Sequence, residues 1–187
     1  MAHYLWKPTR WLEDEIRRRL SHPVDKPFIA VHVRFTDNIP DFAKSFGRNA
    51  TYTRQLTHFV ELGNEIAKSH KALTGIEIRD VYIATDHAQV LAWARQLFVG
   101  WNVWGQENDV QRSTTQSRVW FARGRSSAAG AMATDLQVLR RADYLIGSFQ
   151  SNVYRLAAQL NTAWHIDRYS VRERRHFTVD VEWFEDP

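Results

Sequence analysis

The chain has 187 residues, of which 44% are hydrophobic, and this is enough for one domain with a proper core. It contains no cysteine, which excludes disulfides and thiolate metal sites, and we recognise neither a signal peptide nor an apolar run that could span a membrane. The formal net charge of +4 favours an anionic ligand but is too small to indicate nucleic acid.

The N-terminal part of the chain predicts a helix that begins near Thr9 and stops at Pro23. Acidic residues lie early in it and the arginines of residues 17–19 lie late, as the helix dipole favours. The arginine run is typical of a solvated helix end. We expect residues 1–27 to form an N-terminal helix region and residues 168–187 a tail, within one domain that covers the whole chain.

A short apolar run rich in β-branched residues then predicts a buried strand over residues 28–34. Alternation of side chains along a strand puts His32 and Arg34 on the same face. A buried strand accommodates a charged residue only at its end, so we expect Arg34 at the carboxyl end, at the mouth of a crevice. Ligands bind there in open α/β sheets, and the planar donor fork of arginine suits phosphate.

Helices and strands alternate along the rest of the chain. The expected helices cover about 51–68, 88–98, 127–142 and 152–161, and the expected strands cover 81–84, 101–104, 143–147 and 163–166. This alternation predicts an α/β fold, a Rossmann-like three-layer α/β/α arrangement with a mostly parallel sheet.

The remaining segments are polar or mixed. The loop 35–50 is long enough to suggest a function. Residues 105–127 carry four arginines and form either a mobile surface loop, which we favour, or a lid over an anion. The tail 171–184 alternates charged and apolar residues, so we expect it to form a strand or to pack on the sheet edge.

Three polar features follow or interrupt the predicted elements. Asp86 follows a strand and is either a helix N-cap or a group that lines the same crevice as Arg34. Asp135 lies in the middle of a helix, an unfavourable place unless it faces water or holds a partner. The turn Ser148–Ser151 offers N–H groups, hydroxyls and a helix dipole to an anion, although serine is also simply a good N-cap.

Three motifs in order resemble those of the α1,6-fucosyltransferase family, which includes the rhizobial nodulation enzymes and the animal N-glycan core enzymes. The first is His32-Val33-Arg34-Phe35-Thr36-Asp37, the second is Tyr82-Ile83-Ala84-Thr85-Asp86, and the third is Asp135 with residues 141–155. The resemblance spans roughly residues 3–165 and fades in the tail.

The resemblance implies a GT-B glycosyltransferase with two Rossmann-like halves, of which the C-terminal half binds GDP-fucose. This chain resembles the C-terminal half only, and neither the N-terminal half nor the SH3 domain of the animal enzymes has a counterpart in it. The implied partners are a GDP-sugar donor and a glycan or glycoprotein acceptor, with no metal cofactor and no nucleic acid. Animal members work in the Golgi, which would be the compartment of this chain only if it follows them.

The family's residue roles carry over one position at a time. Arg34 matches an arginine that contacts the donor diphosphate and is needed for activity, and His32 matches a residue near the guanine and ribose. Asp135 matches an aspartate that recognises guanine, and Ser151 matches a phosphate-contacting serine at a helix N-terminus. The expected donor-binding residues are His32, Arg34, Asp37, Asp86, Asp135, Ser148, Gln150 and Ser151.

The sequence also departs from the family pattern. Phe35 replaces the second arginine, Asn38 replaces a lysine, and Phe42 falls where the family has its proposed catalytic base. Asp41 is the neighbouring candidate for that base, so the expected catalytic residues are Arg34 and Asp41.

These departures leave alternatives open. One hypothesis is an inverting fucosyltransferase; another is a catalytically silent GDP-sugar-binding module or the detached half of a larger enzyme. A nucleic-acid or polyanion binder ranks last, because the basic residues are scattered.

Overall fold

The computed structural model describes residues 6–19, 26–34, 48–106, 125–149, 151–168 and 177–180. The described helices are α2 (Arg10–Arg19), α4 (Arg48–Thr74), α5 (Ala88–Leu97), α8 (Arg125–Leu139) and α9 (Asn152–Arg168). The described strands are β1 (Phe28–Val33), β2 (Asp80–Thr85), β3 (Asn102–Trp104), β4 (Tyr144–Gly147) and β5 (Phe177–Asp180). Within these ranges no helix combines the length and the apolar character needed to cross a bilayer.

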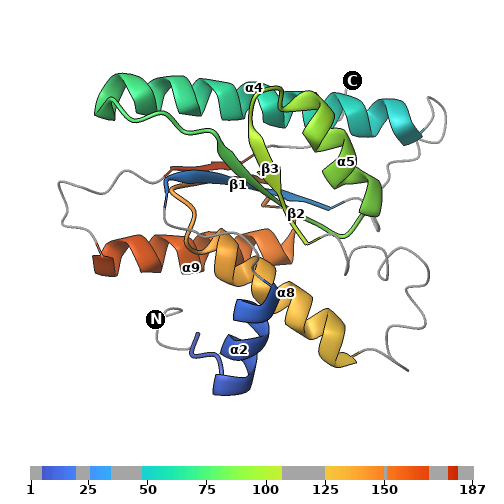
Figure 1. Ribbon diagram of the computed structural model, residues 1–187, viewed down its shortest axis with the longest axis vertical. Coiled ribbons are helices and arrows are strands. Elements are labelled where there is room, and N and C mark those ends of the chain that lie inside the picture. Colours follow the sequence, from blue (N-terminus) through green and yellow to red (C-terminus); the bar gives the residue numbers. More distant parts are fainter. Residues whose placement is uncertain are drawn as a thin grey trace.

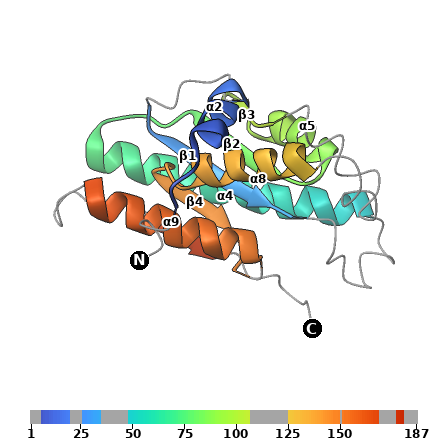
Figure 2. The same cartoon turned by 90° about the horizontal axis from the view of Figure 1, so that it is seen from below.

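The strands form one parallel sheet in the order β3-β2-β1-β4-β5 (Figure 1). β1 is central: it pairs with β2 from Phe28↔Asp80 to Val33↔Thr85, and with β4 around Ala30↔Leu145. Helices α4 and α5 lie on one face of the sheet, and α8 and α9 lie on the other, with α2 outside α8 (Figures 1 and 2). The α/β three-layer prediction with a parallel sheet is confirmed.

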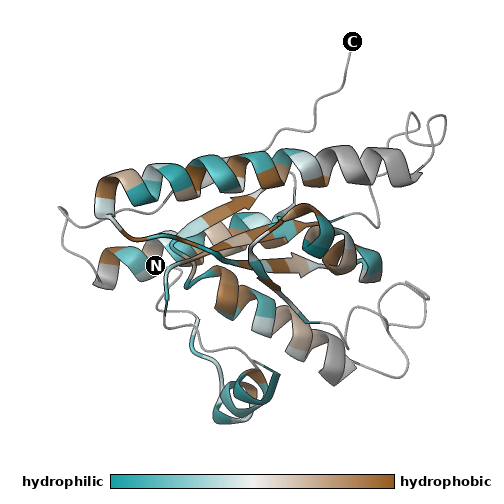
Figure 3. Cartoon of the chain, turned by 45° about the horizontal axis from the view of Figure 1, so that its top comes forward, coloured by the Kyte–Doolittle hydropathy of each residue, from teal (hydrophilic) through white to brown (hydrophobic). Residues whose placement is uncertain are grey.

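Alternation along the strands divides the core into two layers. On the α4–α5 side lie Ile29 and Val31 of β1, and on the α8–α9 side lie Phe28 and Ala30. All six residues of β1 are buried, which accounts for the apolar run that identified the strand in the sequence. Figure 3 shows the strands mostly in the hydrophobic colour and the outer helix surfaces mostly in the hydrophilic one.

The C-terminal part corrects one prediction and confirms another. The strand expected over residues 163–166 is wrong, because α9 continues through them to Arg168. Asn161 and His165 lie one helical turn apart, are both buried, and both bond the carbonyl oxygen of Ala142, which keeps the chain helical. The expected strand in the tail is confirmed as β5, at the sheet edge beside β4.

The end of α8 depends on a single buried amide. Nδ2 of Asn161, on α9, donates to the carbonyl oxygens of Leu139, Arg140 and Ala142, at 3.3, 3.1 and 2.7 Å. The last carbonyls of a helix have no partner within it, so this side chain supplies what the helix itself cannot. It therefore joins α8 to α9 and fixes the turn into β4.

We expect Asn161→Ala to lower the free energy of unfolding by about 2–4 kcal/mol, because it leaves buried carbonyls without a donor. Urea unfolding at pH 7 measures this change. Asn64→Ala, which removes an exposed asparagine that accepts one bond from Trp101, is the matched control and should change stability by less than about 1 kcal/mol. Equal losses in the two variants would contradict this role of Asn161.

Candidate functional site

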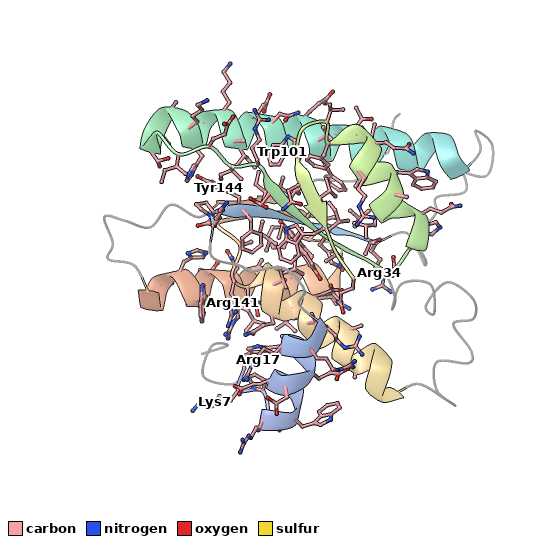
Figure 4. The ribbon with its side chains drawn as sticks, in the orientation of Figure 1. Lys7, Arg17, Arg34, Trp101, Arg141 and Tyr144 are labelled. Carbon is pink, nitrogen blue, oxygen red and sulfur yellow. The ribbon has the colours of Figure 1, made fainter. Side chains whose placement is uncertain are left out.

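The strand order places the expected ligand crevice at the carboxyl ends of β1 and β4. From β1 the chain passes through α4 to β2 and through α5 to β3, on one face of the sheet. It then returns through α8, on the other face, to β4 on the far side of β1. The order in which strands are added therefore reverses between β1 and β4, and α/β sheets bind ligands at such a point. Arg34 directly follows β1 and Ser148 directly follows β4, and the two strands are paired as Val31↔Ile146. Figure 4 shows Arg34 at the opposite end of the sheet from Tyr144, the first residue of β4.

His32 lies on the α8–α9 side of β1, just before the carboxyl edge. Its ring is buried, with its centroid 6.1 Å from that of Tyr154. Burial lowers the pKa of His32 to about 4; the negative charge of Asp86 opposes this, and the positive charge of Arg34 adds to it. The imidazole is therefore neutral at pH 7, with one nitrogen able to donate a hydrogen bond and the other able to accept.

The turn after β4 brings a helix N-terminus to the same edge. A Cβ added to Gly147 would lie 2.5 Å from the ring of Tyr154, so only glycine lets that ring pack against the end of β4. The Ser151 N–H donates to the Ser148 carbonyl (3.0 Å), and the Ser151 Oγ accepts from the N–H of Tyr154 (3.4 Å). Ser151 is therefore the N-cap of α9, and its hydroxyl hydrogen can still be donated.

Asp135 on α8 has the partners that explain its place inside a helix. Its Oδ1 atom accepts hydrogen bonds from the Tyr82 hydroxyl (2.5 Å) and from Nε2 of Gln106 (2.7 Å). Burial raises the pKa of Asp135 to about 6, while these two hydrogen bonds and the charge of Arg19 lower it and the charge of Asp86 raises it. A buried carboxylate whose charged form is held at this cost is a candidate functional group.

Asp86 does not cap a helix. The N-cap residue of α5 is His87, whose side chain makes no capping hydrogen bond, so the N-cap interpretation of Asp86 is wrong. Instead, the charge of Asp86 acts on both His32 and Asp135. Asp86 and Arg34 therefore both lie near enough to His32 for their charges to act on it, and the interpretation that Asp86 lines a ligand crevice stays a prediction.

The arginine run of α2 is only partly a solvated helix end. The side chains of Arg17 and Arg18 are 76% and 70% exposed, but that of Arg19 is 10% exposed and pairs with Glu15 at 2.7 Å. Arg19 lies against α8, near enough to lower the pKa of Asp135. This contact was not expected from the sequence, because it comes from the packing of two helices far apart in the chain.

The two hydrogen-bond partners of Asp135 were not expected from the sequence. Sequence reasoning did not assign roles to Tyr82 and Gln106; the one signal was a tyrosine hydroxyl in an otherwise apolar strand. The described residues contain no group of three or more His, Asp or Glu that could hold a metal ion. Outside the described residues lie Asp37, Asp41, Gln150, Phe35, Asn38 and Phe42, and nearly all of the expected loops 35–50 and 105–127.

Comparison with known proteins identifies relatives of this chain. The family described as alpha-(1,6)-fucosyltransferase N- and catalytic domains matches residues 1–173. The alpha-(1,6)-fucosyltransferase of Drosophila melanogaster is 24% identical over 146 residues, which are 76% of this chain and 21% of that protein. The chain therefore spans about a fifth of the length of that relative.

Solved fucosyltransferase structures also resemble this chain, at lower sequence identity. The fucosyltransferase NodZ from Bradyrhizobium is 18% identical, with a TM-score of 0.45 over 81% of this chain and 42% of that chain. POFUT1 in complex with GDP-fucose is 14% identical, with a TM-score of 0.49 over 93% of this chain and 47% of that chain. Because the family match covers residues 1–173 of the 187, the chain belongs to the alpha-(1,6)-fucosyltransferase family.

Proposed function

We propose that the crevice binds GDP-fucose as a sugar donor and that the chain transfers fucose to a glycan hydroxyl with inversion. The observation that carries this proposal is that His32, Asp86 and Asp135 lie close enough to act on one another's charges, with Arg34 also acting on His32 at the carboxyl end of the central strand. The order of motifs and the family membership agree with it.

The base would be recognised by Asp135. Guanine presents a ring N–H and an amino group side by side, and a carboxylate is a hydrogen-bond acceptor with no donor that would clash with them. Uracil presents one N–H between two carbonyl oxygens, and a carboxylate repels those oxygens. His32, which is neutral at pH 7 and buried beside the strand end, supplies a donor or acceptor to the nucleoside.

The diphosphate would lie between Arg34 and the N-terminus of α9. Arg34 is exposed directly after β1, so its guanidinium can reach a ligand without leaving a buried site. Ser151 caps a helix of 17 residues, whose N-terminal dipole and hydroxyl favour an anion. The same charges would stabilise the leaving GDP during transfer.

The remaining expected residues belong to the same proposal. Asp86 and Ser148 lie at the carboxyl edge, and Asp37 and Gln150 complete the donor set by family resemblance. Inverting transfer also needs a base that takes the proton of the acceptor hydroxyl, and Asp41 is our candidate. The acceptor itself is a glycan or glycoprotein.

The alternative is a GDP-sugar-binding module that does not catalyse transfer. Phe35, Asn38 and Phe42 replace polar residues of the family pattern, and the chain spans about a fifth of its fly relative. Nucleotide binding with no turnover against any glycan acceptor would favour this alternative.

We expect saturable binding of GDP in isothermal titration at pH 7.5 and much weaker binding of UDP. Asp135→Ala should weaken GDP binding roughly ten- to a hundredfold, because it removes a charged hydrogen-bond acceptor. Asp14→Ala, on the exposed surface of α2, is the control and should bind as the unmodified chain does. Equal affinity for GDP and UDP would contradict the proposed base recognition.

Arg34→Ala should abolish fucose transfer and weaken GDP binding, because the diphosphate loses its cation. The measurement is release of GDP from GDP-fucose with a glycan acceptor, alongside GDP titration. Arg79→Ala removes an exposed arginine that pairs with Glu77 next to the start of β2, and it should leave both readouts unchanged. Unchanged affinity together with unchanged turnover in Arg34→Ala would remove Arg34 from the site.

The ligand-free protein should be more stable when Asp135 is replaced by asparagine. The folded-state pKa of Asp135 is raised from 3.8 to about 6, so the folded state binds more protons than the unfolded state between these values. The stability of the unmodified chain therefore falls as pH rises through this window and stays lower above it. We expect Asp135→Asn to gain on the order of 2–3 kcal/mol at pH 8 and little at pH 4.

Urea unfolding of both proteins at pH 4, 6 and 8 measures this difference in stability. His32 makes the stability depend on pH in the opposite direction, but it does so equally in both proteins, so its contribution cancels in the difference. Asp14→Asn is the control and should show no such dependence on pH. A difference between Asp135→Asn and the unmodified chain that does not change with pH would show that burial does not destabilise the charged form of Asp135.

A further inference from the structure

We propose that Tyr82 and Gln106 are positioning residues, which hold Asp135 by its Oδ1 atom and leave its Oδ2 atom to accept hydrogen bonds from the base of the donor nucleotide. This inference rests on the proposed function, since it assigns the means by which the same site orients its carboxylate. The two residues come from different parts of the chain and meet Asp135 from the sheet and from the segment after β3.

The tyrosine hydroxyl is fixed in place by the sheet. Tyr82 is 1% exposed in β2, and its ring lies 4.6 Å from that of Trp104, between centroids. The ring therefore cannot move without disturbing the α8–α9 layer of the core, and its hydroxyl lies 2.5 Å from Oδ1 of Asp135. Burial and the nearby carboxylate raise the pKa of Tyr82 well above 10, so the hydroxyl remains a donor at every working pH.

The amide of Gln106 is fixed by two acceptors. Its Nε2 atom donates to Oδ1 of Asp135 at 2.7 Å and to the carbonyl oxygen of Ala131 at 2.8 Å. Reversing the amide would turn its oxygen toward both of these acceptors, so only one orientation is stable. Ala131 precedes Asp135 by one turn of α8, and the amide thus ties the segment after β3 to the same helix face.

The two donors leave the carboxylate asymmetric. Both are directed at Oδ1, whereas Oδ2 receives no hydrogen bond from the described residues and is not sealed inside the protein. A carboxylate oxygen without a donor, on a side chain that is otherwise fixed, is suited to accept a hydrogen bond from an N–H group of guanine. Holding the group in place beforehand reduces the entropy that binding would cost.

The charges around Asp135 determine how its ionisation should respond. Arg19 on α2 favours the charged form, Asp86 after β2 disfavours it, and the hydrogen bonds from Tyr82 and Gln106 favour it. Loss of either donor should therefore raise the pKa of Asp135 above its present value of about 6. Guanine binding that requires the carboxylate would then need a more alkaline pH.

The test uses Tyr82→Phe and Gln106→Leu, with GDP titration from pH 5 to 9 and a carbon-13 titration of the Asp135 carboxyl in the ligand-free protein. We expect GDP affinity to fall roughly tenfold at pH 7 in each variant, as for loss of one hydrogen bond to a charged group. The pH midpoint of binding and the pKa of Asp135 should both rise by about one unit. At pH 9, where Asp135 is ionised in the variants as well, their loss of GDP affinity should be smaller than at pH 7.

Tyr144→Phe is the matched control. Tyr144 is also a buried strand tyrosine with a hydrogen-bonded hydroxyl, 2.8 Å from Nδ1 of His70, but it lies on the opposite face of the sheet, in the α4–α5 layer of the core. Its loss should cost similar stability without moving either pH midpoint. A change in the control as large as in Tyr82→Phe would attribute the effect to general destabilisation and overturn the proposal.

The outcomes separate this inference from the proposed function. If the unmodified chain does not bind GDP, the donor site fails, and the role of Oδ2 fails with it. If GDP binds and Asp135→Ala abolishes binding, but Tyr82→Phe and Gln106→Leu keep the original midpoints and affinity, only the positioning role is overturned.

Discussion

The structure depends on one constraint, the burial of β1 on both of its faces. A parallel strand in the centre of a sheet must be covered by helices on each side, which places α4 and α5 on one face and α8 and α9 on the other. Such a strand tolerates polar groups poorly within its length. Its one polar residue, His32, is held neutral, and its first charge, Arg34, appears only where the strand has ended.

Polar groups at the two ends of the sheet are used differently. At the amino end, the carboxylate of Asp143 accepts the N–H of Phe28 (3.0 Å) and Asn161 satisfies the carbonyls at the end of α8. At the carboxyl end, Asp135 and His32 are held under conditions that disfavour their charged forms. Asp143 and Asn161 hold neighbouring helices and strands together. In contrast, Asp135 destabilises the ligand-free fold at alkaline pH and His32 destabilises it at acidic pH.

A raised pKa does not by itself distinguish these two kinds of residue. Burial raises the pKa of Asp143 as it does that of Asp135. The difference lies in geometry: Asp143 is engaged with the backbone of a neighbouring strand, whereas Asp135 keeps one oxygen without a donor among the described residues and lies near the charge of Asp86, which follows β2. Stability given up at such a position is a common feature of binding sites.

The sequence by itself determined the central strand, the alternation of helices and strands, and the three motifs of the family, because each is written in local spacing and residue type. It also placed Arg34 at a strand end and identified Asp135 as anomalous in a helix. It could not supply the partners of Asp135, since Tyr82 and Gln106 lie 53 and 29 residues away and reach it only through the strand order and the docking of α8.

Only the tertiary structure decided the extent of α9 and the position of Arg19. The segment 163–166 has strand-like composition, but the contacts of Asn161 and His165 with Ala142 hold it in a helix. The run of arginines at the end of α2 looks uniformly solvated until α2 packs against α8. In each case the deciding free energy comes from contacts between segments distant in the chain, which local periodicity does not encode.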